Sequence, residues 1–275
     1  MTTPAEPLAR FRDLLAAEWT KLWSLRSTRW GYGLSALAVI GFNVNGAYAD
    51  YTNWPGYSLE VRTQYFFPMW AMHDAFNRNS MMIMILAVGA LGAMAVVTEY
   101  ASGLIRTTFA AVPARRSVMA AKVLVVTAVM TAYGVLVSGC SFWLTQAVLS
   151  GRHVGLSIGY PGALRLVVAS ALVAPVCGLA GMAVGTLIRT SATSVVSVIV
   201  LLVVAPLSIP VNHYWQAVIS HALPFNAWRR LLEGNPPPWF HEQYPTTGTG
   251  AWTVLAAWAL VAVALTVLPV HRRDL

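Results

Sequence analysis

The sequence alternates between long uncharged runs and short polar segments. No charged residue occurs between Asn79 and Thr98, and none occurs between Val123 and Gly151. About 20 helical residues, at 1.5 Å per residue, cross the roughly 30 Å hydrocarbon layer of a bilayer. The pattern therefore predicts an all-α polytopic membrane protein with six transmembrane helices, at residues 30–49, 79–98, 120–149, 164–188, 192–209 and 251–270.

A different periodicity precedes the first predicted span. In residues 8–28 the apolar side chains recur at steps of three and four, with charged residues between them. A helix with one apolar stripe and this much charge is typical of a segment that lies in the membrane interface. We expect Trp19 and Trp23 at headgroup depth, with Lys21 as a further interfacial anchor. An ordinary soluble helix is the alternative for this segment.

Two polar segments and one small-residue pattern complete the layout. Residues 99–119 are a short basic segment between the second and third spans, and residues 212–250 are a longer outer loop. The apolar part of that loop is too short to span and predicts short re-entrant or interfacial helices. In the fourth span, small residues at four-residue steps predict close helix packing, and Pro175 predicts a kink or a loosened hydrogen-bond ladder.

Composition agrees with the membrane class. The chain is 57% hydrophobic and 10% charged, whereas soluble domains carry about 25% charged residues. The net charge of +8 is better explained by basic cytoplasmic loops than by nucleic-acid binding. Placing the N-terminus inside puts twelve of the 18 Lys and Arg residues on the inner side. We therefore expect a multi-pass plasma-membrane protein with both termini cytoplasmic, in contact with lipid and with no nucleic-acid partner.

The sequence contains no recognisable catalytic motif. It has neither a Gly-x-x-x-x-Gly-Lys-Ser/Thr phosphate loop nor a His-Glu-x-x-His pair. No ionisable residue falls near the middle of a predicted span, whereas ion-coupled carriers usually have one there. We therefore expect no catalytic residue, no metal site and no cofactor in this chain. An ion-coupled secondary carrier and a non-catalytic membrane assembly factor remain the alternatives to the function inferred below.

The segment from Glu99 to Lys122 has features beyond its charge. Gly103 permits a chain reversal, residues 104–109 form a short amphipathic turn with Arg106 and Thr107 on the wet side, and Pro113 ends it. We expect the charges of this segment to face the cytoplasm, where another protein can bind them. On residue physics alone, a plain basic loop that orients the protein explains the segment equally well.

A family resemblance favours the partner-binding interpretation. The motif Glu99-Tyr-x-Ser-Gly-x-Ile-Arg-Thr-Thr, followed by Pro113, the Arg115-Arg116 pair and Lys122, resembles permease subunits of the ABC-2 type. These are membrane domains of bacterial ABC exporters, similar in fold to the type V or G-subfamily exporters. Weaker similarities are Glu18-Trp-Thr-Lys21-Leu, Leu223-Pro-Phe-Asn-Ala227 and Arg272-Arg-Asp-Leu275.

The resemblance implies a working assembly of several subunits. Residues 8–28 would be a connecting helix, and residues 100–112 would be a coupling helix that rests in a groove of a separate ABC ATPase. Two ATPase subunits would bind ATP and Mg, and a second permease subunit would complete a homodimer or heterodimer, so this chain would not itself be an enzyme. The implied ATPase-coupling residues are Glu99, Tyr100, Ser102, Gly103, Arg106, Thr107, Arg115 and Arg116.

The resemblance also implies a path for a hydrophobic or amphipathic substrate. In such exporters the second and fifth spans would line a cavity across the two-fold axis. The candidate path residues are Asn43, Met81, Met82, Met84, Val198 and Leu202. From the residues alone, an asparagine in a span more often bonds to a neighbouring helix, and methionines more often fill gaps between helices.

Overall fold

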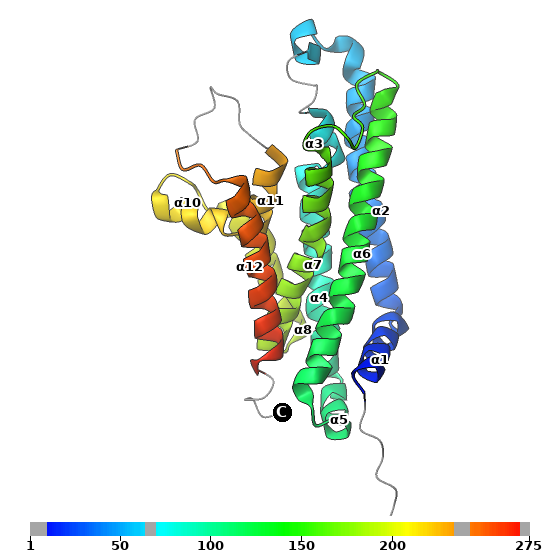
Figure 1. Ribbon diagram of the computed structural model, residues 1–275, viewed down its shortest axis with the longest axis vertical. Helices are drawn as coiled ribbons and strands as arrows, with labels where there is room; N and C mark the ends of the chain where they lie inside the picture. The colour runs from blue at the N-terminus through cyan, green and yellow to red at the C-terminus, as the bar shows by residue number, and fades with distance from the viewer. Residues whose placement is uncertain (1–9, 64–69, 234–242, 270–275) are drawn as a thin grey trace, which may run out of the picture.

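The computed structural model describes residues 10–63, 70–233 and 243–269, and its regular elements there are all helical. Five long helices run side by side along the molecule, with α1 and α5 at one end and α3 at the other (Figure 1). The helices are α1 (Phe11–Ser24), α2 (Arg26–Asn53), α3 (Ala71–Ala75), α4 (Arg78–Ala101), α5 (Leu104–Ala111), α6 (Arg115–Ser150), α7 (Ala163–Ile188), α8 (Ser191–Ile199), α9 (Ala205–Ser208), α10 (Tyr214–His221), α11 (Pro224–Glu233) and α12 (Gly248–Val267). A short 3₁₀ turn (Trp54–Gly56) follows α2, and a π-helical turn (Val200–Val204) joins α8 to α9.

Within the described residues, five helical stretches are long and apolar enough to cross a membrane, with mean hydropathies of 2.0 to 2.4. They are Ala71–Ala101, Arg115–Ser150, Ala163–Ile188, Ser191–Ser208 and Gly248–Val267. The predicted first span, residues 30–49, lies inside α2, which has 28 residues but is not one of the five. Its glycines, Asn43 and Asn45 lower its apolar character. The structure thus supports a multi-pass membrane protein with five clear candidate spans.

The predicted boundaries need three adjustments. Helix α6 begins at Arg115, five residues before the predicted position, because the chain becomes helical directly after Ala114. Helix α12 covers Gly248–Val267 rather than 251–270, and residue 270 lies outside the described residues, as do Arg272 and Arg273. The interfacial segment predicted at 8–28 is divided, since Leu25 adopts an extended conformation between α1 and α2.

Helix α1 presents part of its apolar stripe outward, whereas Leu15 and Leu22 pack against the buried clusters. Its buried residues are Leu14 and Glu18, whereas Phe11 and Trp19 are exposed. Trp23 is half-buried and packs between the rings of Trp19 and Tyr32. A surface helix with exposed aromatic rings is suited to the headgroup region of a membrane.

Helix α7 occupies the centre of the bundle, packed against α4, α6 and α12. Small residues bring its backbone close to its neighbours, as the sequence predicted. A Cβ atom added to Gly181 would lie 2.0 Å from the carbonyl oxygen of Gly89, and one added to Gly92 would lie 2.0 Å from the carbonyl oxygen of Gly178. Helices α4 and α7 therefore pack backbone to backbone, an arrangement that glycine permits in membranes.

Pro175 lies within α7, and the helix continues through it from Ala163 to Ile188. A proline has no N–H, so the carbonyl of Ala171 lacks its usual donor four residues on. This carbonyl faces Gly134 of α6, where an added Cβ would lie 2.1 Å from its oxygen. Because Gly134 has no side chain, α6 can approach the Ala171 carbonyl closely. A Cα–H contact from Gly134 can then partly replace the hydrogen bond that this carbonyl lacks.

The close contact at Gly181 gives the first testable prediction. Gly181→Ala places a methyl group against the backbone of α4, so we expect a loss of about 1–3 kcal/mol in the free energy of unfolding. The matched control is Gly139→Ala on α6, because an added Cβ there meets nothing within 4 Å. Thermal denaturation of the two variants in the same detergent checks this. Equal midpoints would show that α4 and α7 are not packed as described.

The segment predicted as an outer loop, residues 212–250, contains the short helices α10 and α11 within its described part, in agreement with the short helices expected there. Trp228 of α11 is buried and donates from Nε1 to the Ser170 hydroxyl of α7 at 2.9 Å. The Asn226 amide donates to the carbonyl of Ser220 at 2.9 Å, which fixes the turn between α10 and α11. Helix α11 is therefore attached to the bundle rather than free in the loop.

Candidate functional site

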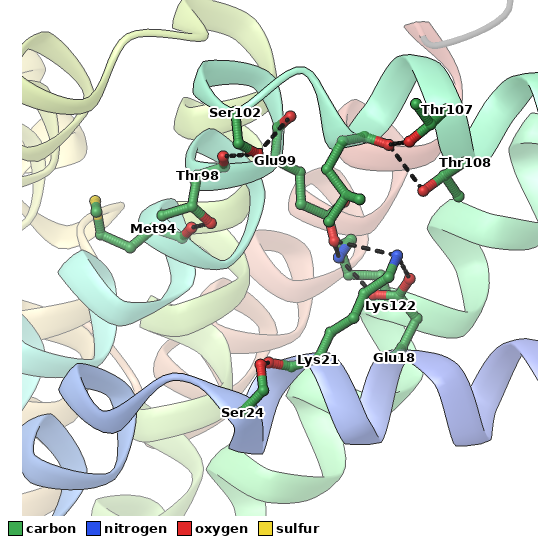
Figure 2. A network of polar contacts seen from close by, with 11 residues as sticks. Glu18, Lys21, Ser24, Met94, Thr98, Glu99, Ser102, Thr107, Thr108 and Lys122 are labelled. Atoms are coloured by element: carbon green, nitrogen blue, oxygen red, sulfur yellow. Dashed lines mark hydrogen bonds and ion pairs between the residues drawn. The ribbon is translucent and has the colours of Figure 1, made fainter.

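Four charged side chains from three helices meet near the α5 end of the bundle. Glu18 and Lys21 come from α1, Glu99 from the last turn of α4, and Lys122 from the third turn of α6. Figure 2 shows these side chains pointing toward one another. We refer to them as the charge ring, because each carboxylate contacts both ammonium groups.

The distances of the charge ring define two bridging ammonium groups. Lys21 Nζ donates to Glu18 Oε1 at 2.7 Å and lies 3.3 Å from Glu99 Oε1. Lys122 Nζ donates to Glu99 Oε1 at 2.8 Å and also to Glu18 Oε2. Two negative and two positive groups thus form a closed and neutral set. This compensation allows the charges to be buried, since an unpaired ion there would be very costly.

Local sequence places each member of the charge ring. Glu18 and Lys21 lie three residues apart on α1, so they share one helix face. Glu99 and Lys122 are brought together by the intervening reversal, in which Gly103 adopts a left-handed conformation with φ of 72°. A residue with a Cβ rarely adopts this conformation, whereas glycine does so readily.

Exposure differs among the four side chains. Glu18, Glu99 and Lys122 have side chains that are 3–8% exposed, whereas the side chain of Lys21 is 29% exposed. Burial tends to lower the pKa of Lys21, but its hydrogen bond to Glu18 and the charge of Glu99 outweigh this, so that the pKa is raised. Lys21 is therefore a fully charged cation at neutral pH.

The burial of Glu99 and Lys122 differs from the sequence-based prediction. Both belong to the segment whose charges were expected to face the cytoplasm. The prediction treated each charge alone, whereas opposite charges on α1 neutralise them and permit their burial. Neither side chain is free to bind a partner in this conformation.

Helix α5 lies directly beside the charge ring and is held by two apolar anchors. Ile105 and Phe109 are buried and pack in a cluster with Leu14 of α1 and with Val118 and Met119 of α6. The other side of α5 is exposed and includes Leu104, Arg106 and Thr107. The amphipathic turn predicted from the sequence is thus present, except that Leu104 faces outward.

The remaining predicted coupling residues fall into two groups. Ser102 and Arg116 are exposed, with Ser102 donating to the carbonyl of Thr98 at 2.8 Å. Tyr100, Gly103 and Arg115 are half-buried. The guanidinium of Arg115 lies 5.5 Å from the centre of the Phe109 ring and so covers one of the anchors of α5.

A contact that the sequence did not indicate joins this end of α4 to the α7–α8 turn. Arg189 ends α7 in a left-handed conformation, with φ of 65°, and its guanidinium lies 4.9 Å from the centre of the Tyr100 ring. Such a cation–π contact contributes about 0.5–1 kcal/mol at an exposed site and more when desolvated. Two contacts therefore connect α5 to the turn before α8: Tyr100 packs against the cluster that contains Phe109, and Arg189 lies over the Tyr100 ring.

The structure places the predicted substrate-path residues in the interior of the chain. Met81 and Met84 of α4 are buried, as are Val198 of α8 and Leu202 in the π-helical turn, and Met82 is partly buried against them. Gly89 brings α4 and α8 together, since an added Cβ would lie 2.7 Å from Val198 Cγ1. The two predicted path helices thus pack on each other within one chain.

Asn43 joins three helices at the opposite end of the bundle. Its amide donates to Ser141 Oγ of α6 at 3.0 Å, and its carbonyl accepts from Ser80 Oγ of α4 at 2.5 Å and from the backbone of Asn77 at 3.0 Å. The side chain is buried and has partners at both ends. This agrees with the interhelical alternative that its sequence position left open.

Two charge-ring residues, Glu18 and Lys122, were not selected as site residues from the sequence, although both lie in the stretches that carry the family resemblance. The scarcity of acidic residues could have drawn attention to Glu18, since the whole chain has only 10 Asp and Glu.

Among the described residues, no group of three or more His, Cys, Asp or Glu side chains could hold a metal ion. No protein-family model matches the chain, and no curated protein matches it.

Proposed function

We propose that this chain is the membrane subunit of an ATP-driven exporter of the ABC-2 type, with a separate ATPase that binds the exposed face of α5. The proposal places six spans in a bacterial plasma membrane, with α2 as the first, both termini cytoplasmic, and a second permease subunit beside this one. The substrate class that suits the apolar helices is hydrophobic or amphipathic.

One observation carries the proposal: α5 is a short amphipathic helix outside the spans that packs against α1, α4 and α6 and is still exposed on one face. Force on that face would reach α1 and α6 through the apolar anchors Ile105 and Phe109. It would reach the start of α8 through Tyr100 and Arg189, and α8 packs against α4. A helix that only oriented the protein in the membrane would not need these attachments.

The charge ring also bears on the alternative of an ion-coupled carrier, because ionisable residues inside membrane helices often mark ion or proton pathways. Here each carboxylate contacts two ammonium groups, so protonation of either Glu18 or Glu99 would leave excess positive charge in a buried site. A carboxylate in a proton-coupled carrier must instead gain and lose its proton during each cycle. The ring is therefore better suited to holding helices together than to exchanging protons.

The test of the proposed function uses the full chain purified from its native membranes. We expect it to copurify with a protein that carries a phosphate-binding loop, and we expect ATP hydrolysis by the complex but none by the chain alone. Gradient-driven uptake into liposomes that contain this chain without any ATPase would overturn the proposal in favour of a carrier.

A sharper prediction concerns Arg106 on the exposed face of α5. Arg106→Glu reverses a charge without disturbing the buried anchors. We expect it to reduce ATP hydrolysis by the complex about tenfold, which corresponds to about 1.4 kcal/mol of like-charge repulsion at the interface. Arg12→Glu on α1 is the matched control, because Arg12 is also an exposed arginine but lies outside α5. Equal activity of the two variants would place the ATPase contact elsewhere.

A further inference from the structure

A pocket of about 370 Å³ lies between the α1–α2 junction, α4 and α6, next to the charge ring. We call it the junction pocket. Its volume falls in the range of about 300–1,000 Å³ that is typical of small-molecule sites. One part of its lining is apolar and includes Leu22, Leu91, Met94, Ala95, Val125 and Val126. The other part is polar. The pocket therefore has an apolar part and a polar part side by side, as a lipid molecule does.

Three hydroxyl groups in the polar part already donate to backbone carbonyls, so they do not need a ligand to accept their hydrogen bonds. Ser24 donates to the carbonyl of Lys21 at 2.8 Å, Thr98 to that of Met94 at 2.7 Å, and Ser102 to that of Thr98 at 2.8 Å. Figure 2 shows these three bonds around the charge ring. The hydroxyls of Ser24, Thr98 and Ser102 therefore do not determine which charge the pocket prefers.

The charge that a ligand can reach in the junction pocket is positive. Glu18, Glu99 and Lys122 also line it, but their side chains are almost fully buried and paired with one another. Lys21 is the most exposed member of the ring and contacts two carboxylates, whereas an ammonium group has three N–H donors. One donor of Lys21 is therefore available to an anionic group that enters the pocket.

The position of the pocket identifies the source of such a group. Most of its apolar wall belongs to α4 and α6, two of the candidate spans, and it lies where they meet α1, a helix with exposed Phe11 and Trp19. Arg26 and Arg29, at the start of α2, are exposed and are neighbours in the sequence of the lining residues Ser27 and Thr28, although Arg29 also donates from Nε to the carbonyl of Trp23 at 2.7 Å. Basic residues at this level attract the anionic lipids of the cytoplasmic leaflet. This step depends on the membrane placement in the proposed function, but not on an ATPase partner.

We propose that the junction pocket binds one anionic phospholipid of the inner leaflet, with an acyl chain against Leu91, Ala95 and Val126 and the phosphate at Lys21. The bound lipid would fill the gap that the bend at Leu25 leaves between α1 and the spans. A zwitterionic lipid would fit the apolar part equally well but would gain less from Lys21.

The test is native mass spectrometry of the purified full chain, titrated with phosphatidylglycerol or with phosphatidylcholine. We expect one tightly retained phosphatidylglycerol per chain, bound about tenfold more strongly than phosphatidylcholine, which corresponds to one well-formed charge contact. Lys21→Gln should remove most of this preference while leaving the binding of either lipid measurable. Equal binding of the two lipids to the wild-type chain would overturn the role of Lys21.

Ala95→Phe should fill the apolar part of the junction pocket and weaken phosphatidylglycerol binding about tenfold or more. Its matched control is Ala128→Phe on α6, because Ala128 is exposed and does not line the pocket. Equal loss or equal retention in the two variants would overturn the proposed site. Displacement of the lipid by glycerol phosphate alone would show a site for free phosphate and would overturn the role of the acyl chain.

A measurement on the wild-type chain covers the case in which Ala95→Phe does not fold. Phosphatidylglycerol with a photoreactive acyl chain should crosslink mainly to residues 91–95 and 122–126. Crosslinks spread evenly over exposed positions such as Leu136 and Trp143 would contradict the proposal. None of these experiments requires an ATPase or measures ATP hydrolysis, so their outcome is separate from success or failure of the exporter assay.

Discussion

Lys122→Met should lower the free energy of unfolding by about 3–5 kcal/mol, the usual cost of removing one partner from a buried ion pair. Lys122 contacts both Glu18 and Glu99, and its side chain is 5% exposed. Methionine has a similar length, so the main change is a net negative charge left inside the junction of α1, α4 and α6. Unfolding by SDS in mixed micelles, followed by tryptophan fluorescence, measures the difference.

Two variants separate the charge effect from a simple loss of packing. Lys21→Met removes the more exposed cation of the charge ring, so we expect a smaller cost of about 1 kcal/mol or less. Glu99→Gln combined with Lys122→Met removes one charge of each sign and should be less destabilised than the sum of the two single variants, by about 0.5–3 kcal/mol. If Lys122→Met unfolds like the wild type, the four charges do not meet as described.

Much of the fold was predictable because hydrophobic length is a strong signal in membrane proteins. The predicted spans at 79–98 and 164–188 correspond closely to α4 (Arg78–Ala101) and α7 (Ala163–Ile188). The four-residue repeat of small side chains correctly predicted the close packing of α7. Each of these predictions used information from one stretch of the chain, where charge, length and spacing act locally.

The charge ring could not be predicted in the same way. Glu18 and Lys122 are 104 residues apart, and nothing in either local sequence indicates that they meet. A charge at the end of a predicted span is assumed to be hydrated, and that assumption was wrong for Glu99 and Lys122. Their burial depends on the position of α1, which is set by the extended conformation of Leu25 and by the packing of Leu14 on α5 and α6.

The predicted substrate path shows a related limit. Methionine and valine positions on the second and fifth spans were assigned to a cavity through the family resemblance. In the structure Met84 and Val198 are buried in the core, while Val196, Val200, Val204 and Leu207 are exposed along the other side of α8, the π-helical turn and α9. Apolar composition alone does not distinguish the face that packs on a neighbouring helix from the face left uncovered. Under the proposed function, this exposed stripe is the better candidate for contact with substrate or with a second permease subunit.

Phe109→Ala should detach α5 while leaving the bundle folded. Phe109 is buried, and truncating a buried phenylalanine costs about 3–5 kcal/mol, more than an eight-residue helix gains from its own backbone. Hydrogen exchange should therefore become fast at the amides of residues 104–111, while α7 keeps its protection, since local opening need not involve the core. The result does not require a partner protein and tests the attachment of α5 directly.

The same variant has the largest expected effect on the proposed activity. If the ATPase acts through α5, transport by the Phe109→Ala complex should fall about a hundredfold or more, which corresponds to about 2.7 kcal/mol in the coupled step. Phe11→Ala on α1 is the matched control, because Phe11 is also aromatic but 43% exposed. Faster exchange in α5 with transport at the wild-type rate would separate α5 from energy coupling and leave the charge ring with a purely structural role. Loss of transport together with retained ATP hydrolysis would show that the ATPase remains active but no longer moves the spans. The reason would be that removing the apolar anchor Phe109 breaks the connection from α5 to α1, α6 and the α7–α8 turn.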